Sequence, residues 1–515
     1  MNRHCRADNC TIIVLAVLVL GLSSSSLFAA GKQKTLPKVT INEAEFRDKV
    51  FACWMGKNIG GTLGAPLEGK RDMHNLTFYD PVPEKASAND DLDLQLLWLK
   101  ALEENGPNIN ARILGGYWLK FVPVDWNEYG IGKANMRAGF QPPLSGQFRN
   151  KWRDSNGAWI RTEIWACLAP GCPAIAARYA WEDACVDHGA AEGTNAAMFV
   201  AALESAAFVE SDRDKLIEIG LSYIPPDCAV AKSINAAIEA HKKGLDLTAA
   251  RHEVLNASKS TGWFMAPQNV AFVILGWLYG EGDFGKSLCC AVNCGDDTDC
   301  TGATLGSILG IIHGAKGIPE NWTKPVGSSI STVAVAGFKH PRTIDELTDR
   351  TVAMTHIVLK ELDAPVAIAA DAATDPKAAV KLKLIDPAAA KTLWARSGYQ
   401  LIYDFVAVRA TLDFLADPVV EKGKPCQMKL WLENQTPHTL EIAAAWWPPL
   451  GLTAAPAAST VKLPARSHKP VAVETTFTAE RIPDTNLPGA VQLRIKGQSP
   501  VSIISFTLKG KPPTE

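Results

Sequence analysis

The chain has 515 residues, of which 47% are hydrophobic and 21% charged, so it is a folded globular protein and not a disordered, collagenous or coiled-coil chain. At about 150 residues per domain, the length allows roughly three domain-equivalents. The 52 Lys and Arg residues nearly balance 54 Asp and Glu residues, for a formal net charge of −2. Because like charges do not form long runs, we expect no nucleic-acid partner and no polybasic membrane patch.

Residues 1–30 are predicted to be a signal peptide. They combine a basic start at Arg3 and Arg6, an apolar run over residues 12–22 and small residues at 29–30, an order typical of secretory signals. The apolar run is too short to span a bilayer comfortably. We therefore expect an exported protein, periplasmic or extracellular, that has no membrane segment after cleavage; a signal anchor is the alternative. The sequence does not predict the oligomeric state.

Residues 31–363 are predicted to form an all-α domain. Asn42, with Glu45 three positions later, resembles the capping box at the start of a helix. Residues 269–279 are almost wholly apolar over the length of a helix, which is typical of a helix buried on every side. Further along, Gly306 lies in another apolar stretch, where it would let a second helix approach closely.

Residues 364–398 are predicted to be a linker and residues 399–515 an all-β domain. The linker is rich in Ala, Pro and Asp, and beyond it apolar residues alternate with period two, as at Val406 and Val408. About seven short strands, separated by turn residues, are typical of an immunoglobulin-like sandwich. The predicted fold class is therefore multidomain, with an all-α domain followed by an all-β, immunoglobulin-like sandwich.

Ten of the twelve cysteines lie after residue 30, a density too low for a disulfide framework. They show no paired CxxC spacing and no nearby set of histidines, so a zinc site is not predicted. We expect small, buried side chains with one or two disulfides among them. The ten are Cys53, Cys167, Cys172, Cys185, Cys228, Cys289, Cys290, Cys294, Cys300 and Cys426.

Two acidic clusters each begin an apolar helix. The first is Asn89, Asp90 and Asp91, and the second contains Asp297 and Asp299. Carboxylates in a first helical turn can be simple capping groups. However, both helices are too apolar for the surface, so we expect their acidic ends to converge in a cleft, where carboxylates repel unless a cation lies among them. All-oxygen ligands favour Mg²⁺ or Mn²⁺, with Ca²⁺ as a further candidate.

A glycine-rich segment, GKNIGGTLGAPLEG, covers residues 56–69. Its spacing matches neither a dinucleotide-binding fingerprint nor a phosphate-binding P-loop. Two interpretations stay open. The segment is either a flexible helix end and turn, or a glycine-lined approach that presents Glu68 to a cleft.

The segments GGTLGAPLEG, NDDLDLQL and GDDTDCTGATLGSILG, in this order, resemble the motifs of the ADP-ribosylglycohydrolase superfamily over residues 46–363. The resemblance implies an all-α fold in which two Mg²⁺ or Mn²⁺ ions lie between the acidic motifs and contact ribose hydroxyls. It implies Glu68 as the residue that activates water, assisted by Asp91 or Asp297. The implied metal ligands are Asn89, Asp90, Asp91, Asp297 and Asp299.

Three positions depart from the family pattern, because Asn89, Leu92 and Cys300 stand where relatives usually have Thr. An Asn side chain still offers a carbonyl oxygen, but a Cys is a poor ligand for a hard ion. We therefore expect one or two ions, with one of the two sites altered or absent.

The segment between the acidic motifs supplies candidate substrate contacts. Residues 155–166 resemble the ligand loop of the family, and Asp187 with His188 matches a Thr-His pair of relatives. The resemblance implies that Asn156 and His188 contact the sugar or the leaving group, although a structural role for His188 is the alternative. Trp159 is the first candidate to stack on a sugar or base, and core packing is its alternative.

Together, the resemblance and the export signal predict a metal-dependent glycoside hydrolase. It would cleave the bond at the anomeric carbon of a ribosyl or related sugar, with a sugar, glycan or ribosyl compound as its partner. The alternatives are an ADP-ribosyl hydrolase proper and a non-catalytic, metal-dependent carbohydrate-binding protein. A metal-dependent phosphoesterase is a weaker option.

Overall fold

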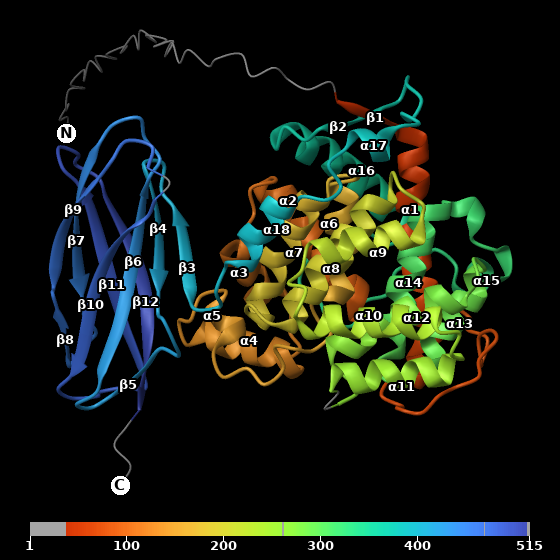
Figure 1. Ribbon diagram of the computed structural model, residues 1–515, viewed down its shortest axis with the longest axis horizontal. Coiled ribbons are helices and arrows are strands. Elements are labelled where there is room, and N and C mark those ends of the chain that lie inside the picture. Colours follow the sequence, from red (N-terminus) through yellow and green to blue (C-terminus); the bar gives the residue numbers. More distant parts are fainter. Residues whose placement is uncertain (1–37, 260–261, 468, 512–515) are drawn as a thin grey trace, which may run out of the picture. The chain divides into compact units, whose positions relative to one another are not determined.

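The computed structural model describes residues 38–259, 262–467 and 469–511, so the predicted signal peptide lies outside the described residues. Helices dominate the first part of this chain and strands the last part, as Figure 1 shows. The predicted order of a helical domain followed by an all-β region is thereby confirmed. In the described ranges, no helix combines the length and the apolar character needed to cross a membrane.

The helices up to the second acidic motif are α1 (Glu43–Gly64), α2 (Asp90–Asn105), α3 (Ala111–Phe121), α4 (Asn127–Arg137), α5 (Leu144–Gln147), α6 (Glu163–Leu168), α7 (Pro173–His188), α8 (Glu192–Ala207), α9 (Arg213–Ser222), α10 (Ala229–Lys242), α11 (Leu247–Ser258), α12 (Ala266–Tyr279) and α13 (Phe284–Asn293). The later helices are α14 (Thr298–His313), α15 (Glu320–Val326), α16 (Ile344–Glu361), α17 (Ala378–Lys381) and α18 (Pro387–Trp394).

Helices α1 and α14 pack against each other at unusually short range, because glycines of one face backbone of the other. A Cβ atom at Gly60 would lie 1.9 Å from the carbonyl oxygen of Gly302, and one at Gly306 would lie 2.1 Å from that of Gly56. The predicted close approach at Gly306 is confirmed. The glycine-rich segment up to Gly64 is thus the buried part of a helix, and its glycines serve packing rather than flexibility.

The start of α1 is fixed by Asn42, as predicted. Its side chain accepts hydrogen bonds from the backbone N–H groups of Ala44 and Glu45, at 3.0 and 3.1 Å. The capping box is not reciprocal, however, because the Glu45 carboxylate accepts from the hydroxyl of Thr374. The backbone N–H of Asn42 also donates to Thr374, over 2.9 Å. Thr374 therefore takes the place of the hydrogen bond that Glu45 would make to the Asn42 N–H in a complete capping box.

A two-stranded parallel sheet lies beside this helix start. Strand β1 (Val39–Asn42) pairs with β2 (Val366–Ala369), so that Val39 lies opposite Val366. The segment predicted as a linker, residues 364–398, contains β2, α17 and α18 and contributes buried residues to the helical core. The helical region therefore includes this segment in its packing.

The remaining strands form two antiparallel-dominated sheets that share one core. Their orders are β3-β4-β6-β10-β8 and β5-β12-β11-β7-β9. Trp446 of the second sheet packs against Phe477 of the first, with ring centroids 5.8 Å apart. The strands are β3 (Gln400–Asp404), β4 (Val408–Asp413), β5 (Val419–Glu421), β6 (Pro425–Asn434), β7 (Leu440–Trp447), β8 (Leu452–Ala455), β9 (Ala458–Leu463), β10 (Val471–Ala479), β11 (Asn486–Ile495) and β12 (Val501–Lys511).

The described sheets contain more strands than the seven or so that the sequence predicts. The additional strands include β5, which is only three residues long, and β8 and β9, each of which has a single buried residue. Such edge strands are specified by pairing with neighbours rather than by their own pattern.

The core of the sheets also includes side chains from the helical part of the chain. Phe140, Leu144 and Phe148 are buried among the sandwich residues. Arg112 of α3 adds a hydrogen bond of 2.8 Å to the carbonyl oxygen of Ile402 in β3.

None of the cysteines in the described ranges forms a disulfide, and most are buried. The expectation of small buried side chains is confirmed, whereas the one or two expected bridges are not formed. Some of the buried thiols also donate hydrogen bonds, as Cys294 does to the carbonyl oxygen of Cys290 and Cys300 does to Asp91.

Candidate active site

The N-terminal ends of α2 and α14 meet at one pocket with a volume of about 360 Å³. The pocket brings together predicted site residues from three separate parts of the sequence: Glu68, Asn89, Asp90, Asp297 and Asp299. The remaining lining residues are Ala65, Ala88, Trp126, Asn127, Glu128, Tyr129, Ile160, Trp263, Phe264, Cys300 and Val333. The predicted convergence of the two acidic clusters in a cleft is thus present in the structure.

Glu68 follows the short 3₁₀ turn that ends α1, and two contacts fix its place beside the second acidic motif. The Thr298 hydroxyl donates to the carbonyl oxygen of Gly64 over 2.8 Å, and the Gly69 N–H donates to that of Asp296 over 2.9 Å. The Glu68 side chain is exposed at the pocket. Desolvation by the pocket wall, followed by the Asp299 and Asp90 carboxylates, raises its pKa to about 7. Glu68 can therefore hold or release a proton near neutral pH.

The first acidic motif is ordered by its own helix cap. The side-chain oxygen of Asn89 accepts from the backbone N–H of Asp91 over 2.9 Å, and its amide donates to Asp299 Oδ2 over 3.2 Å. The Asn89 side chain consequently links the two acidic motifs. Asp90 accepts a 2.7 Å hydrogen bond from the Tyr129 hydroxyl.

The second acidic motif is held by two asparagines. The backbone N–H of Asp297 donates to Asn269 over 3.1 Å, and its carboxylate accepts from the Asn156 amide over 2.6 Å. Burial, followed by the Asp299 charge, raises the pKa of Asp297 well above its ordinary value. Asn156, predicted as a substrate contact, thus bonds to a predicted metal ligand.

Trp159 lies outside the pocket lining, and its side chain is fully buried. Its indole N–H donates to the Asn156 side-chain oxygen over 2.9 Å. The ring therefore has no exposed face on which a sugar could stack, and the core-packing alternative describes it better. Its contribution to the site is to orient Asn156.

A buried ion pair lies behind the first acidic motif, and the sequence reasoning did not identify it. The Lys57 ammonium donates to Glu163 and to the carbonyl oxygen of Ile160, both over 2.7 Å, and lies 3.7 Å from Asp91 Oδ2. Gln95 donates to the other Glu163 oxygen, also over 2.7 Å. The sequence did contain a signal for this ion pair, namely a lysine inside a Gly-rich apolar helix. A lysine in such a helix is buried, and a buried charge needs a partner.

Two groups of side chains in this site could hold a metal ion. Glu68, Asp297 and Asp299 form one, and Asp91, Asp299 and Cys300 form the other; within each group the ligand atoms lie within 4.8 Å of one another. Asp91 Oδ2 and Asp299 Oδ1 are buried and accept no hydrogen bond from any described residue. Buried carboxylate oxygens left in this state fit a divalent cation.

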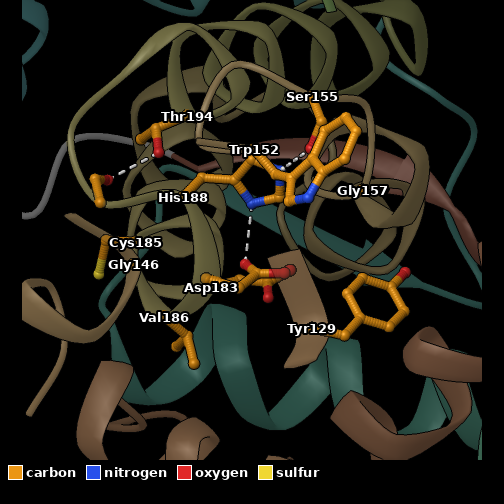
Figure 2. A network of polar contacts seen from close by, with 12 residues as sticks. Tyr129, Gly146, Trp152, Ser155, Gly157, Asp183, Cys185, Val186, His188 and Thr194 are labelled. Carbon is orange, nitrogen blue, oxygen red and sulfur yellow. Dashed lines mark hydrogen bonds and ion pairs between the residues drawn. The ribbon is translucent and has the colours of Figure 1, made fainter. Parts of the chain in front are cut away.

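His188 belongs to a different network, shown in Figure 2, and does not line the pocket. Its Nδ1 pairs with Asp187 at 2.9 Å, and its Nε2 lies 3.2 Å from the Ser155 hydroxyl, which leaves no ring nitrogen free. Although burial opposes ionisation, Arg161 and His188 lower the pKa of Asp187 to about 2. Glu128, Asp187 and His188 lie close enough to hold an ion, but the guanidinium of Arg161, 2.8 Å from Asp187, already supplies the positive charge. This arrangement favours the structural alternative for His188.

Several pocket residues were missed from the sequence. Glu128 is 1% exposed, and its Oε2 accepts no hydrogen bond from the described residues. Burial raises its pKa to about 7. Trp126, Trp263 and Phe264 add aromatic surface to the wall. None of these residues lies in a recognisable motif, so no sequence signal marked them.

The helical region gathers the acidic starts of two helices around one pocket, as the sequence motifs of a glycohydrolase family predict. Comparison with known proteins gives the same class. A family model described as ADP-ribosylglycohydrolase matches residues 42–361. The chain belongs to this family, whose name indicates a hydrolase of the glycohydrolase type, and the resemblance seen in the sequence is confirmed.

Among solved structures, the chain is similar to one titled "ADP-ribosylglycohydrolase-related protein complex". The two are 18% identical with a TM-score of 0.41, over 61% of this chain and 99% of that one. No curated protein matches the chain.

Proposed function

We propose that this protein is a metal-dependent glycoside hydrolase that cleaves the bond at the anomeric carbon of a ribosyl or related sugar. The observation that carries the proposal is the placement of Glu68 in one group with Asp297 and Asp299, at the pocket that also holds the first acidic motif. Membership of the ADP-ribosylglycohydrolase family supports a glycohydrolase.

Within this site, the predicted ligands Asn89, Asp90, Asp91, Asp297 and Asp299 would hold one or two divalent cations, Mg²⁺ or Mn²⁺. A bound cation would act as a Lewis acid that binds and orients neighbouring hydroxyl groups of the sugar. Glu68 would accept a proton from the water that attacks the anomeric carbon, the role of a general base. Cleavage passes through a transition state with oxocarbenium character.

The pocket wall favours a neutral sugar over a pyrophosphate compound. Its described lining contains neither Lys nor Arg, which are common and strong partners of phosphate groups. Trp126, Trp263 and Phe264 offer aromatic faces of the kind that stack on sugars. The family name keeps an ADP-ribosyl hydrolase proper as the second candidate.

The test is release of sugar from ribosides, arabinosides and ADP-ribosyl compounds, with and without EDTA. We expect turnover that EDTA abolishes and Mg²⁺ or Mn²⁺ restores. Glu68→Gln should lower kcat about 10²- to 10⁴-fold, because it removes the base while keeping the shape of the side chain. Glu84→Gln, at an exposed carboxylate outside the pocket, should match the wild type.

A binding protein without catalysis would give a different result. If no substrate turns over with any of these ions, while wild type and Glu68→Gln bind the same glycans equally, the hydrolase proposal is wrong.

We also propose that the protein is exported, on the strength of residues 1–30 alone. Mass spectrometry of the mature protein, recovered from the periplasm or medium, should find a new N-terminus after residue 29 or 30. An intact N-terminus in the cytoplasmic fraction would contradict export.

A further inference from the structure

Asp299 belongs to both groups of candidate ligands in the active site, and the two groups offer different donor atoms. Glu68, Asp297 and Asp299 present only oxygen. Asp91, Asp299 and Cys300 present two carboxylates and one sulfur. Oxygen donors suit Mg²⁺ and Mn²⁺, whereas sulfur favours softer ions such as Zn²⁺. The two groups therefore differ in the kind of ion they suit.

The second group is deeply buried and has free coordinating capacity. Asp91 is 0%, Cys300 4% and Asp299 7% exposed. One oxygen of each carboxylate, Asp91 Oδ2 and Asp299 Oδ1, accepts no hydrogen bond from the described residues. A buried oxygen without a donor costs free energy of about 1–3 kcal/mol, and an ion bound between these side chains would remove that cost.

The spacing of the ligands fits a soft ion. Cys300 Sγ lies 3.6 Å from Asp91 Oδ1. A tetrahedral zinc ion, with Zn–S of about 2.3 Å and Zn–O of about 2.1 Å, places its sulfur and oxygen ligands roughly 3.6 Å apart. A hydrogen bond from the thiol to Asp91 has the same length, so the ion must be tested directly.

We propose that Asp91, Asp299 and Cys300 form a second cation site beside the all-oxygen site, and that this site takes a thiophilic divalent ion such as Zn²⁺ or Co²⁺. The inference rests on the metal centre of the proposed function. It divides that centre into two ion sites with different donor atoms, which share Asp299. On binding, the Cys300 S–H bond breaks, a sulfur–metal bond forms and the proton passes to solvent. No oxidation or reduction occurs.

Lys57 does not already fill the role of this cation. Its ammonium is 3.7 Å from Asp91 Oδ2 but 2.7 Å from Glu163. Lys57 therefore pairs mainly with Glu163, and the carboxylate oxygens of Asp91 and Asp299 remain available to a divalent ion.

The test uses the full-length protein, stripped with EDTA and loaded with Co²⁺. The wild type should show near-ultraviolet absorption from thiolate-to-cobalt charge transfer, and Cys300→Ser should lose it. Cys290→Ser and Cys426→Ser change half-buried thiols outside the group and should keep the band. With Zn²⁺, elemental analysis should find one ion fewer per chain in Cys300→Ser than in the wild type.

The outcomes separate this inference from the proposed function. A wild type without the band, or a Cys300→Ser variant that keeps it, overturns the thiolate site, whether or not sugars are hydrolysed. A band without turnover of any substrate supports the site and counts against the hydrolase. Mn²⁺ binding to the all-oxygen site, followed by electron paramagnetic resonance, shows that the Cys300→Ser variant remains folded.

Discussion

Lys57 carries a buried charge that links the core of the helical region to the active site. It is 2% exposed. Burial opposes its ionisation, but the Glu163 and Asp91 carboxylates raise its pKa above the ordinary value. Lys57 consequently stays charged, and removal of its carboxylate partner would leave this charge buried without an ion pair.

Replacement of this lysine should destabilise the whole domain. We expect Lys57→Met to lower the free energy of unfolding by about 3–5 kcal/mol, because Glu163 would stay buried without its cation. Urea-induced unfolding measures the change. Lys242→Met removes an exposed pair with Glu239 and should cost less than about 1 kcal/mol. If the two variants lose the same free energy of unfolding, the buried ion pair does not stabilise the domain more than an exposed one.

Glu128 should make stability depend on pH. Its pKa is about 7 in the folded protein, against an ordinary value of 4.5. Between these values the folded state binds a proton that the unfolded state has lost, so stability falls as pH rises, by about 1.4 kcal/mol per pH unit. Glu128→Gln should remove this contribution to the pH dependence of the free energy of unfolding, which urea unfolding between these two pH values would measure. The control Glu253→Gln changes an exposed carboxylate and should keep the pH dependence of the wild type. If Glu128→Gln also keeps it, the raised pKa of Glu128 is contradicted.

Side-chain direction limited what could be predicted for single residues. The order of the motifs correctly anticipated that Glu68, Asn89 and Asp299 share a pocket. Sequence alone left open whether Trp159 and His188 are buried or contact a substrate, because burial on a given side depends on packing partners elsewhere in the chain. Glu128 lacked any local signal, since its burial comes from the tertiary structure.

Among the elements, the contact between α1 and α14 holds the two halves of the acidic site in register. Each helix leads to one part of the site: α1 ends shortly before Glu68, and α14 begins immediately after Asp297. Their backbones approach so closely that glycine is required on both sides. A larger side chain at this contact would separate Glu68 from the second acidic motif.

A methyl group at the contact should therefore affect both stability and activity. We expect Gly60→Ala to cost at least about 1–3 kcal/mol, because the new Cβ would overlap the Gly302 carbonyl. Gly116→Ala, in α3, meets nothing within 4 Å and should be neutral or stabilising by up to about 1 kcal/mol. Thermal unfolding of the two variants compares them. A Gly60→Ala protein as stable as the wild type would show that the helices can separate freely.

The elements differ in how far the sequence predicted them. Helix starts at Asn42 and Asn89 followed from local capping chemistry, and the structure confirms both. Strand β2 was assigned to a linker because its four residues gain strand character only by pairing with β1. Contacts between distant segments of the chain leave no local pattern, which is why β2 and the weakly alternating edge strands were missed.

At the scale of the whole molecule, the core of the β region depends on the helical part of the chain. Phe140, Leu144 and Phe148 are each at most 2% exposed within that core. Phe140 also packs against Phe148, with ring centroids 4.9 Å apart. A change at Phe140 should therefore destabilise strands that lie far along the chain.

Phe140→Ala tests this dependence. We expect a loss of about 3–5 kcal/mol, which is typical of a buried Phe replaced by Ala, and faster hydrogen exchange in β11 and β12. Val406→Ala, at a side chain that is 99% exposed, should change neither quantity. Unchanged exchange in the strands of Phe140→Ala would mean that the β region is stabilised without the helical residues.

The pairing of β1 with β2 has a consequence for biosynthesis. Asn42 and Thr374 are 332 positions apart, and Val39 finds its partner only at Val366. While the ribosome is still adding the intervening residues, the beginning of α1 has neither its neighbouring strand nor the Thr374 hydroxyl. The first turn of α1 thus gains its final contacts only after residue 374 has been synthesised, later than the α14 and α16 helices against which the rest of α1 packs.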